Sequence, residues 1–248
     1  MGIINVTPDS FSGDGLDHEA AIAQGLRMVE EGADLLDVGG ESTRPGHQPV
    51  GADDELARVL PVVEALAARA GVPISIDTTK VEVARVAAEA GATIVNDVWG
   101  LQRAPELASL AAGKDLALVV THNQEGTAYS DLMGQVTEGL EAAVRKARSA
   151  GVAQERIIVD PGIGFGKDWS QNLLLLRRLQ DLEQLGQPIL VGTSRKSFIG
   201  RILDLPVDQR TEGTAATVAI SIMRGADIVR VHDVRAMVRV ARMADALR

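Results

Sequence analysis

Short apolar runs alternate along the chain with longer stretches in which apolar residues recur every three or four positions. The short runs are rich in Val and Ile, which is typical of strands buried on both faces. We interpret eight of them as strands, at residues 2–6, 34–38, 73–77, 93–97, 116–120, 156–160, 188–192 and 227–231. The longer stretches have the period of amphipathic helices. They predict helices at residues 19–31, 53–70, 81–90, 104–112, 132–150, 171–185, 211–224 and 234–247.

This order of elements predicts an α/β protein with a (β/α)8 TIM barrel. Consecutive parallel strands need helical crossovers, and eight such units within 248 residues match the number that closes the barrel. A doubly wound open sheet is the alternative. Nothing in the sequence resembles a linker between two halves, so we expect a single domain over residues 1–248.

Composition and charge narrow the classes of function. Hydrophobic residues make up 46% of the chain but aromatic residues only 2%, so the core must consist of small and branched aliphatic side chains. The net charge of −9 argues against nucleic acid or an anionic membrane as partner, and an anionic ligand would need a local cluster of cations. The absence of cysteine excludes disulfides and thiolate chemistry. Without a signal peptide or an apolar run of about 20 residues, we expect a soluble, cytoplasmic protein.

Polar residues follow nearly every predicted strand at its carboxyl end, and in a barrel these ends converge on one face, where active sites lie. The most distinctive segment is 160–167, in which three glycines alternate with other residues and let the backbone pass close to a bound molecule. Taken alone, it could be a tight turn capped by Asp160. Repetition at other strand ends favours a shared site, with Asn5, segment 39–46, Asp77, Asn96, Asp97, Thr121, His122, Lys196, Ser197, Arg230 and His232.

Four of these segments resemble the signature motifs of the dihydropteroate synthases, a family of pterin-binding TIM barrels. They are GIINVTPDSFS at 2–12, GGESTRPG at 39–46, DPGIGFG at 160–166 and SRKS at 194–197. Their order and their places on the predicted strands extend the resemblance over essentially the whole chain. It implies an enzyme of folate biosynthesis, usually a homodimer and the target of sulfonamides. Such an enzyme joins 4-aminobenzoate to 6-hydroxymethyl-7,8-dihydropterin diphosphate with Mg²⁺ and releases diphosphate.

The resemblance implies a pterin-binding set, and the chemistry of its residues suits that role. A carboxylate can accept both N–H groups of the 2-amino-4-oxo edge of a pterin, which fits Asp160. Asp77 and Asn96 can satisfy further ring nitrogens, while Lys196 can donate to the 4-oxo oxygen. Gly192, at the end of the seventh predicted strand, belongs to the same substrate-binding set. An ion-pair network without a ligand is the structural alternative.

The diphosphate is expected where the last and first strands meet. Arg230 and His232 follow strand eight and Asn5 ends strand one, and these strands are neighbours in a closed barrel. Arginine offers a planar fork for phosphate oxygens, and histidine can donate from a ring nitrogen. The side-chain oxygen of Asn5 is a suitable ligand for Mg²⁺, with diphosphate oxygens and water completing its coordination.

The second substrate carries an aryl ring and a carboxylate. Ser197 lies where a helix follows strand seven, and the N–H groups at such a helix start attract a carboxylate. We expect Phe165 to pack against the aryl ring, although ordinary core packing is its alternative role. Thr43, Arg44 and Pro45 come from the Gly-bounded loop after strand two and are expected to contact substrate.

The predicted mechanism is substitution at the pterin methylene carbon, with departure of diphosphate ahead of attack by the amine. Arg230 and His232 stabilise the leaving group, and Asp77 and Asp160 stabilise the cationic pterin. With Lys196 as pterin donor, these five residues form the expected catalytic set. No strong base is needed, since a neutral aryl amine is already nucleophilic.

Three alternatives remain open from the sequence. Residues 121–123 read Thr-His-Asn where the family commonly has a Met-His-Met type run, which leaves room for a non-catalytic pterin-binding paralogue. A corrinoid-dependent methyltransferase would bind methyltetrahydrofolate in a related barrel, but the Thr43 loop and the Lys196–Ser197 pair favour the synthase. A Schiff-base aldolase would use Lys196 as nucleophile.

Overall fold

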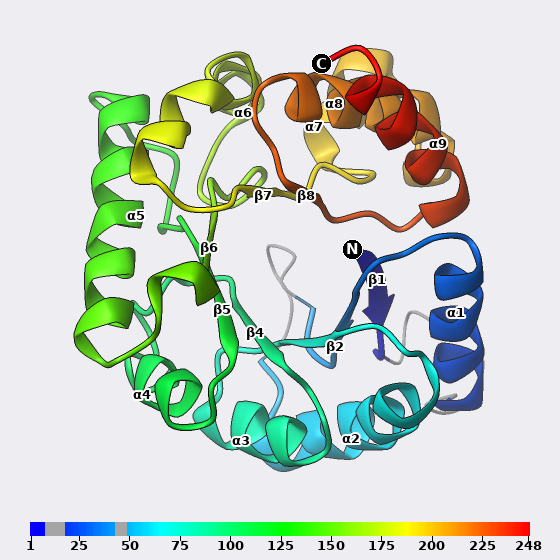
Figure 1. The fold of residues 1–248 in the computed structure, drawn as a ribbon. Coiled ribbons are helices and arrows are strands. Elements are labelled where there is room, and N and C mark those ends of the chain that lie inside the picture. Colours follow the sequence, from blue (N-terminus) through cyan, green and yellow to red (C-terminus); the bar gives the residue numbers. More distant parts are fainter. Residues whose placement is uncertain (8–17, 43–48) are drawn as a thin grey trace.

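The computed structural model describes residues 1–7, 18–42 and 49–248, and in this part of the chain short parallel strands form a ring inside a layer of helices (Figure 1). Val and Ile dominate these strands because both faces are buried, by the interior of the ring and by the helices. The strands are β1 (Gly2–Asn5), β2 (Leu36–Gly39), β3 (Ile74–Asp77), β4 (Ile94–Asp97), β5 (Ala117–Thr121), β6 (Ile157–Asp160), β7 (Leu190–Val191) and β8 (Ile228–Val229).

The strands close into a barrel. β1 to β6 form one parallel sheet in sequence order, and β7 pairs with β8. Isolated parallel bridges join the two sheets on both sides, between Val159 and Ile189 and between Gly2 and Val231. The N–H of Ile3 also donates to the carbonyl of Val231 at 3.0 Å. The predicted barrel is therefore correct, and the open doubly wound sheet is excluded.

The helices cover the outside of the ring, with their apolar faces turned towards the strands. They are α1 (His18–Glu30), α2 (Ala52–Arg69), α3 (Val81–Glu89), α4 (Glu106–Gly113), α5 (Leu132–Ser149), α6 (Trp169–Arg177), α7 (Ser197–Leu203), α8 (Thr211–Met223) and α9 (Val234–Asp245). The prediction of one helix over 171–185 is wrong. The N–H of Arg178 is shared between two carbonyls, of Leu174 and Leu175, and the chain tightens there into a 3₁₀ helix, Leu179–Leu185.

Two apolar clusters form the core. The larger lies between strands and helices and contains fully buried residues such as Ile4, Leu36 and Leu118. The smaller joins Met1, Ile94 and residues of β5 and β7. Since its members come from different sides of the ring, it fills the barrel interior. Buried polar residues lie in the strands above this cluster, from Asp37 and Ser75 within β2 and β3 to Asp77, Asn96 and Asp160 at strand ends.

Strand register brings those polar groups to one level. Gly39 of β2 pairs with Asn5 of β1 on one side and with Asp77 of β3 on the other, and Asp77 pairs in turn with Asn96 of β4.

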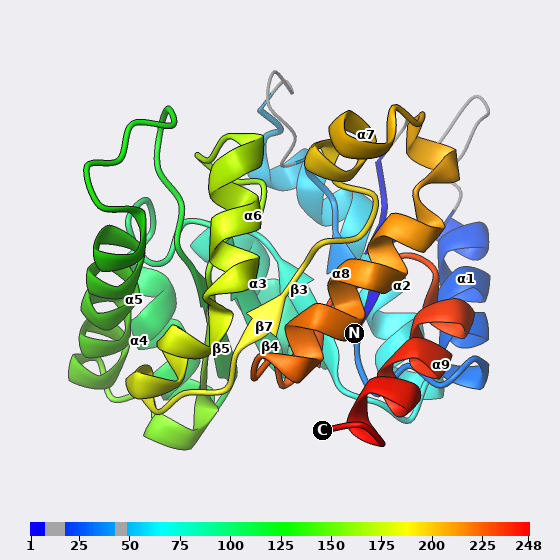
Figure 2. The ribbon, with the colours of Figure 1, turned by 90° about the horizontal axis from the view of Figure 1, so that it is seen from above.

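Figure 2 shows α7 at one end of the molecule and the C-terminus at the other. Within the described residues, no helix is long and apolar enough to cross a membrane.

Candidate active site

Arg230 is the centre of a buried network at the carboxyl ends of the strands. It follows β8, and its Nε donates to Oδ2 of Asp37 at 2.6 Å, while Nη2 donates to Oδ2 of Asp77 at 2.8 Å. Nδ2 of Asn96 donates to the same Asp37 oxygen at 3.1 Å. Three predicted site residues are therefore in one cluster. Arg230, which we expected beside the diphosphate, is also tied to the predicted pterin residues.

Asp37 was missed by sequence reasoning, although it holds this cluster together. Its carboxylate is fully buried in β2, and among the described residues Oδ1 has no hydrogen-bond partner. A buried carboxylate is costly unless it is paired, and Arg230 supplies the pairing charge. One feature of the sequence could have indicated this role: Asp37 is a charged residue between Leu36 and Val38, in a strand that is otherwise apolar.

The cluster changes the proton affinity of Asp77. Burial raises the pKa of this carboxyl to about 7, in opposition to the attraction of Arg230 and together with repulsion from Asp37, Glu55 and Asp97. Asp77 therefore exchanges its proton near neutral pH. Such a perturbed group inside a polar cluster is typical of a functional site.

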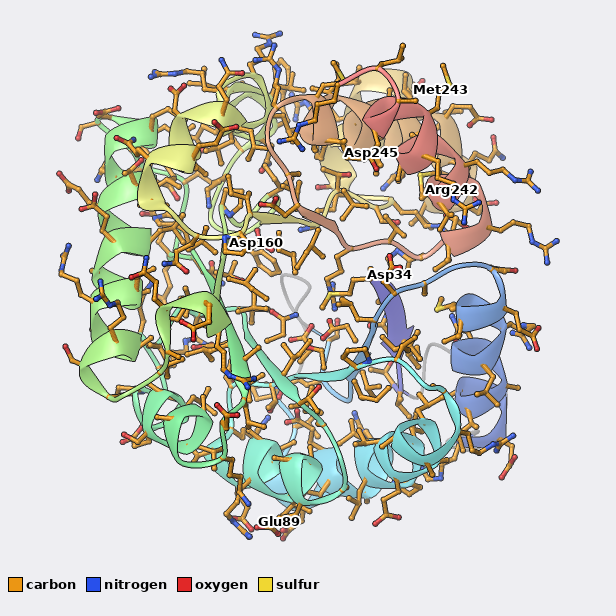
Figure 3. All side chains as sticks on the ribbon, viewed as in Figure 1. Asp34, Glu89, Asp160, Arg242, Met243 and Asp245 are labelled. Atoms are coloured by element: carbon orange, nitrogen blue, oxygen red, sulfur yellow. The ribbon has the colours of Figure 1, made fainter. Side chains whose placement is uncertain are left out.

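Asp160 ends β6, and Figure 3 shows it on the inner side of the ring, in contrast to Glu89 on the outer surface. Its Oδ1 accepts the N–H of Gly162 at 2.7 Å, so the capped-turn interpretation is correct as far as it goes. Burial raises the pKa of Asp160, against the attraction of Lys196, Arg230 and the nearby Lys167. The second carboxylate oxygen accepts no hydrogen bond from the described residues and can serve a ligand.

Lys196 lies across the ring interior from the first cluster, with its ammonium 4.5 Å from the centroid of the Phe165 ring. This nitrogen donates to the carbonyl of Ile163. Burial and Arg230 lower the pKa of Lys196 to about 8, while Asp160 and Asp77 oppose the shift. A cation and an aromatic face are thus adjacent, and Ser197, exposed at the start of α7, follows in sequence.

His232, Asn5 and Gly192 lie at the same ends of the strands as the two clusters. Nδ1 of His232 is 2.9 Å from Oγ of Ser194, and the His232 N–H donates to the same oxygen at 3.1 Å. Asn5 is half-buried at the end of β1. Gly192 is buried directly after β7, and a Cβ added there would lie 3.8 Å from Cβ of Arg230.

Two polar residues from the predicted strand ends have local structural contacts. The carboxylate of Asp97 accepts the N–H groups of Trp99 at 2.9 Å and Leu101 at 2.6 Å, which fixes the turn after β4. His122 contacts Lys167, with 3.1 Å between Nδ1 and Nζ. Thr43, Arg44 and Pro45, which we expected to contact substrate, lie outside the described residues.

A pocket of about 540 Å³ adjoins Asp77 and extends outward past Trp99 to Phe165 and Lys167. Glu41 and the fully buried Glu55 line this pocket, and Lys80 forms ion pairs with both carboxylates. A pocket of this size accommodates a small organic ligand. The clusters and the pocket together provide carboxylates for N–H groups, cations for anions, and an aromatic face.

Comparisons with known proteins define the class to which this fold and site belong. Residues 1–232 match the family model of pterin binding enzymes, so the chain is a member of that family.

Its relatives within the family are dihydropteroate synthases. The Bacillus subtilis dihydropteroate synthase is 48% identical over 250 residues, with 100% of this chain and 87% of the relative covered. The Escherichia coli enzyme of the same name is 43% identical over 256 residues, covering 99% of this chain and 90% of the relative.

Solved structures of dihydropteroate synthases are similar to this chain over nearly its whole length. A Clostridium difficile dihydropteroate synthase, crystallised in the presence of pteroic acid, has a TM-score of 0.97 at 50% identity, covering 99% of this chain and 95% of that one. The Xanthomonas albilineans dihydropteroate synthase with 4-aminobenzoic acid has a TM-score of 0.96 at 44% identity, with coverages of 99% and 91%.

Proposed function

We propose that this chain joins 4-aminobenzoate to 6-hydroxymethyl-7,8-dihydropterin diphosphate, forming 7,8-dihydropteroate and diphosphate. The carbon–oxygen bond at the pterin methylene breaks, a carbon–nitrogen bond to the arylamine forms, and the amine loses one proton. The observation that carries the proposal is the linked cluster of Asp37, Asp77, Asn96 and Arg230 beside Asp160 and Lys196.

We assign the pterin ring to the side of Asp160. One of its oxygens is taken by Gly162, and the other can accept from the 2-amino-4-oxo edge. Asp77 and Asn96 face further ring nitrogens, and Lys196 donates to the 4-oxo oxygen. Since these groups are buried, a pterin that left them unpaired would bind poorly, which gives the site its selectivity.

Arg230 and His232 receive the diphosphate. Two nitrogens of Arg230 are taken by Asp37 and Asp77, but Nη1 has no hydrogen bond to the described residues and can meet a phosphate oxygen. His232, two residues after Arg230, is assigned as a second donor to the anion through a ring N–H. One guanidinium then connects the pterin side to the leaving-group side.

Mg²⁺ is implied by the family, and the donors fit a metal held mainly by substrate. Among the described residues, no group of three His, Asp or Glu side chains could hold a metal ion. The amide oxygen of Asn5 is a hard ligand of the kind that Mg²⁺ prefers, and the remaining ligands would be diphosphate oxygens and water. When bound, the ion neutralises charge on the departing diphosphate.

The arylamine is assigned to the Phe165 and Lys196 side. Its ring packs on Phe165, and its carboxylate meets the Ser197 hydroxyl and the adjacent backbone N–H groups. We also assign Thr43, Arg44 and Pro45, which lie outside the described residues, to the binding of this substrate. In this position the amine lies close to the methylene carbon and can attack it without a general base.

In the proposed reaction, diphosphate departure precedes amine attack. Arg230 and His232 stabilise the anion that leaves, while ionised Asp77 and Asp160 stabilise the positive charge left on the pterin. Their charges are effective because the cluster is buried and held in place before substrate arrives.

We further propose a single domain over residues 1–248, a cytoplasmic location and a homodimer. The dimer is supported by apolar side chains exposed on neighbouring helices: Leu174 on α6, Ile202 and Leu203 on α7, and Ile220 and Met223 on α8. Apolar groups gathered in this way favour a protein interface.

The test is release of diphosphate by purified protein given both substrates and Mg²⁺, with 7,8-dihydropteroate identified as product. Pterin binding without turnover would instead support a non-catalytic paralogue. Binding of methyltetrahydrofolate in preference to the dihydropterin diphosphate would support a methyltransferase. Borohydride trapping of a Lys196 adduct would support an aldolase.

A further inference from the structure

Lys167 is buried, and the mechanism above gives it no role. Only 7% of its surface is exposed, and no carboxylate of the described residues forms an ion pair with it. Its ammonium instead donates to the carbonyls of Phe165 at 2.9 Å, Gly162 at 3.1 Å and His122 at 3.2 Å. A buried cation without a carboxylate partner is costly, so its presence at this place calls for an explanation.

His122 completes this arrangement from the loop after β5. Its Nδ1 lies 3.1 Å from Nζ of Lys167. Burial lowers the pKa of Lys167 to about 7, while Asp160 opposes the shift. In its ammonium form Lys167 can only donate, so the ring then accepts through Nδ1 and carries its proton on Nε2. Burial and the charge of Lys167 lower the pKa of His122 to about 4, in agreement with a neutral ring. One ammonium therefore links the loop after β5 to the loop after β6.

The same contacts fix the peptide groups beside Asp160. Gly162 donates its N–H to Asp160, and its carbonyl accepts from Lys167, so this residue is held on both sides. It has φ of +73°, and an added Cβ would lie 1.9 Å from the carbonyl oxygen of His122. The segment is thus packed too closely to shift without disturbing the orientation of the Asp160 carboxylate.

Lys167 also fixes the other substrate position. The carbonyl of Phe165 accepts from Lys167, and the Phe165 ring lies under the Lys196 ammonium. The Lys167 nitrogen therefore binds the carbonyl of Phe165, on the aryl side, and that of Gly162, whose N–H contacts Asp160 on the pterin side. An error of about 1 Å in the alignment of two reactants can lower a rate by about 100-fold.

We propose that Lys167 is a positioning residue. Its ammonium fixes the distance between Asp160 and Phe165, and this distance aligns the pterin methylene with the arylamine. The proposal rests on the proposed function, because it concerns the alignment of those two substrates. It goes beyond it by assigning a role to a residue that is not among the proposed substrate-binding residues.

The chain has no cysteine, which allows the ammonium to be removed and rebuilt. Lys167→Cys is unfolded and alkylated with bromoethylamine, which restores an ammonium of nearly lysine length, or with iodoacetamide, which gives a neutral group of similar size. Both products are refolded beside the wild type and compared by circular dichroism. Steady-state kinetics with both substrates and calorimetric binding of dihydropterin diphosphate follow.

We expect kcat to fall by about 100-fold in the iodoacetamide product and in Lys167→Met, with pterin affinity reduced about tenfold or less. The bromoethylamine product should recover most of kcat. Lys146→Met is the control for loss of a lysine, since the exposed Lys146 on α5 also donates to a carbonyl, that of Leu101 at 3.5 Å. Its kcat should equal that of the wild type.

Wild-type kcat in Lys167→Met, or equal recovery by both alkylating agents, would overturn the proposal. So would failure of the neutral product to refold, because the role would then be one of stability alone. An inactive wild type in the same assay would count against the proposed function instead, and the two failures are therefore distinguishable.

Discussion

Nε of Arg230 lies 2.6 Å from Oδ2 of Asp37, and this contact joins the end of the last strand to the interior of the second. The two residues are 193 positions apart in sequence. Arg230 can reach Asp77 and a departing anion from one fixed place because Asp37 holds its guanidinium. The geometry of the site thus depends on a residue that we do not expect to contact substrate.

Asp37→Asn should destabilise the fold, since it leaves the half-buried Arg230 with one carboxylate instead of two. We expect the free energy of unfolding to fall by about 3 kcal/mol, measured by urea denaturation. The pKa of Asp77 should also fall, because one repelling charge is lost. Asp115→Asn is the control: Asp115 is exposed and pairs with Arg156 at 2.7 Å, so about 1 kcal/mol or less is expected. Equal losses in both variants would contradict the assigned role of Asp37.

Asp160→Asn should weaken binding of the dihydropterin diphosphate by about 10- to 100-fold, the usual worth of a hydrogen bond to a charged group. An asparagine keeps an oxygen for the Gly162 N–H, so the turn is preserved and only the charge is lost. Titration calorimetry measures the affinity. Asp131→Asn, at the exposed start of α5, is the matched control and should bind normally. Undiminished affinity in Asp160→Asn would remove Asp160 from the pterin site.

The pattern of apolar residues was sufficient to predict the barrel, because buried parallel strands and amphipathic helices have different periods. Barrel topology was likewise enough to bring Asn5, Asp77 and Arg230 to the same ends of the strands. The helix over 171–185 was predicted too long because its apolar spacing continues through the 3₁₀ helix, and the change of hydrogen bonding at Arg178 has no sequence signal.

The contacts within the site could not be predicted, since they depend on distances across the ring. Arg230 could have faced solvent, His232 or Asp37, and only the folded structure distinguishes these three possibilities. Lys167 was noted as the end of a glycine-rich segment, but its carbonyl cage arises from the folding of two loops around it. Buried charged residues inside apolar or glycine-rich segments, such as Asp37 and Lys167, are the signal that sequence reasoning should weigh more heavily.

Turnover should depend on the ionisation of Asp77. Its pKa is raised to about 7, chiefly by burial, so the carboxyl is neutral below that pH and cannot stabilise a cationic pterin. We expect kcat/KM to fall about tenfold for each pH unit below 7 in the wild type. Asp77→Asn should be slow throughout and lack this acidic limb.

The pH dependence of stability due to Asp77 is opposite to that of turnover: the stabilisation decreases as the pH rises. A folded pKa above the unfolded value means that the folded protein holds the proton more tightly, so this contribution is complete below pH 3.8 and is lost as the pH rises through 7. Urea denaturation of the wild type and Asp77→Asn across this range should show the difference. A wild-type kcat/KM independent of pH between 5 and 8 would contradict the assignment.

Lys80 should be essential for stability, because it neutralises Glu41 and the fully buried Glu55 on the pocket wall. Lys80→Met removes the cation that pairs with the fully buried Glu55 carboxylate, and we expect the free energy of unfolding to fall by about 3 to 5 kcal/mol. Adding Glu55→Leu to that variant should restore a large part of the loss, since the most buried charge is then removed. Lys114→Met, which breaks the more exposed pair with Glu89, should change the free energy of unfolding far less than Lys80→Met. If the double variant were no more stable than Lys80→Met, the cost would come from packing of the lysine chain, and the electrostatic account of this wall would be wrong.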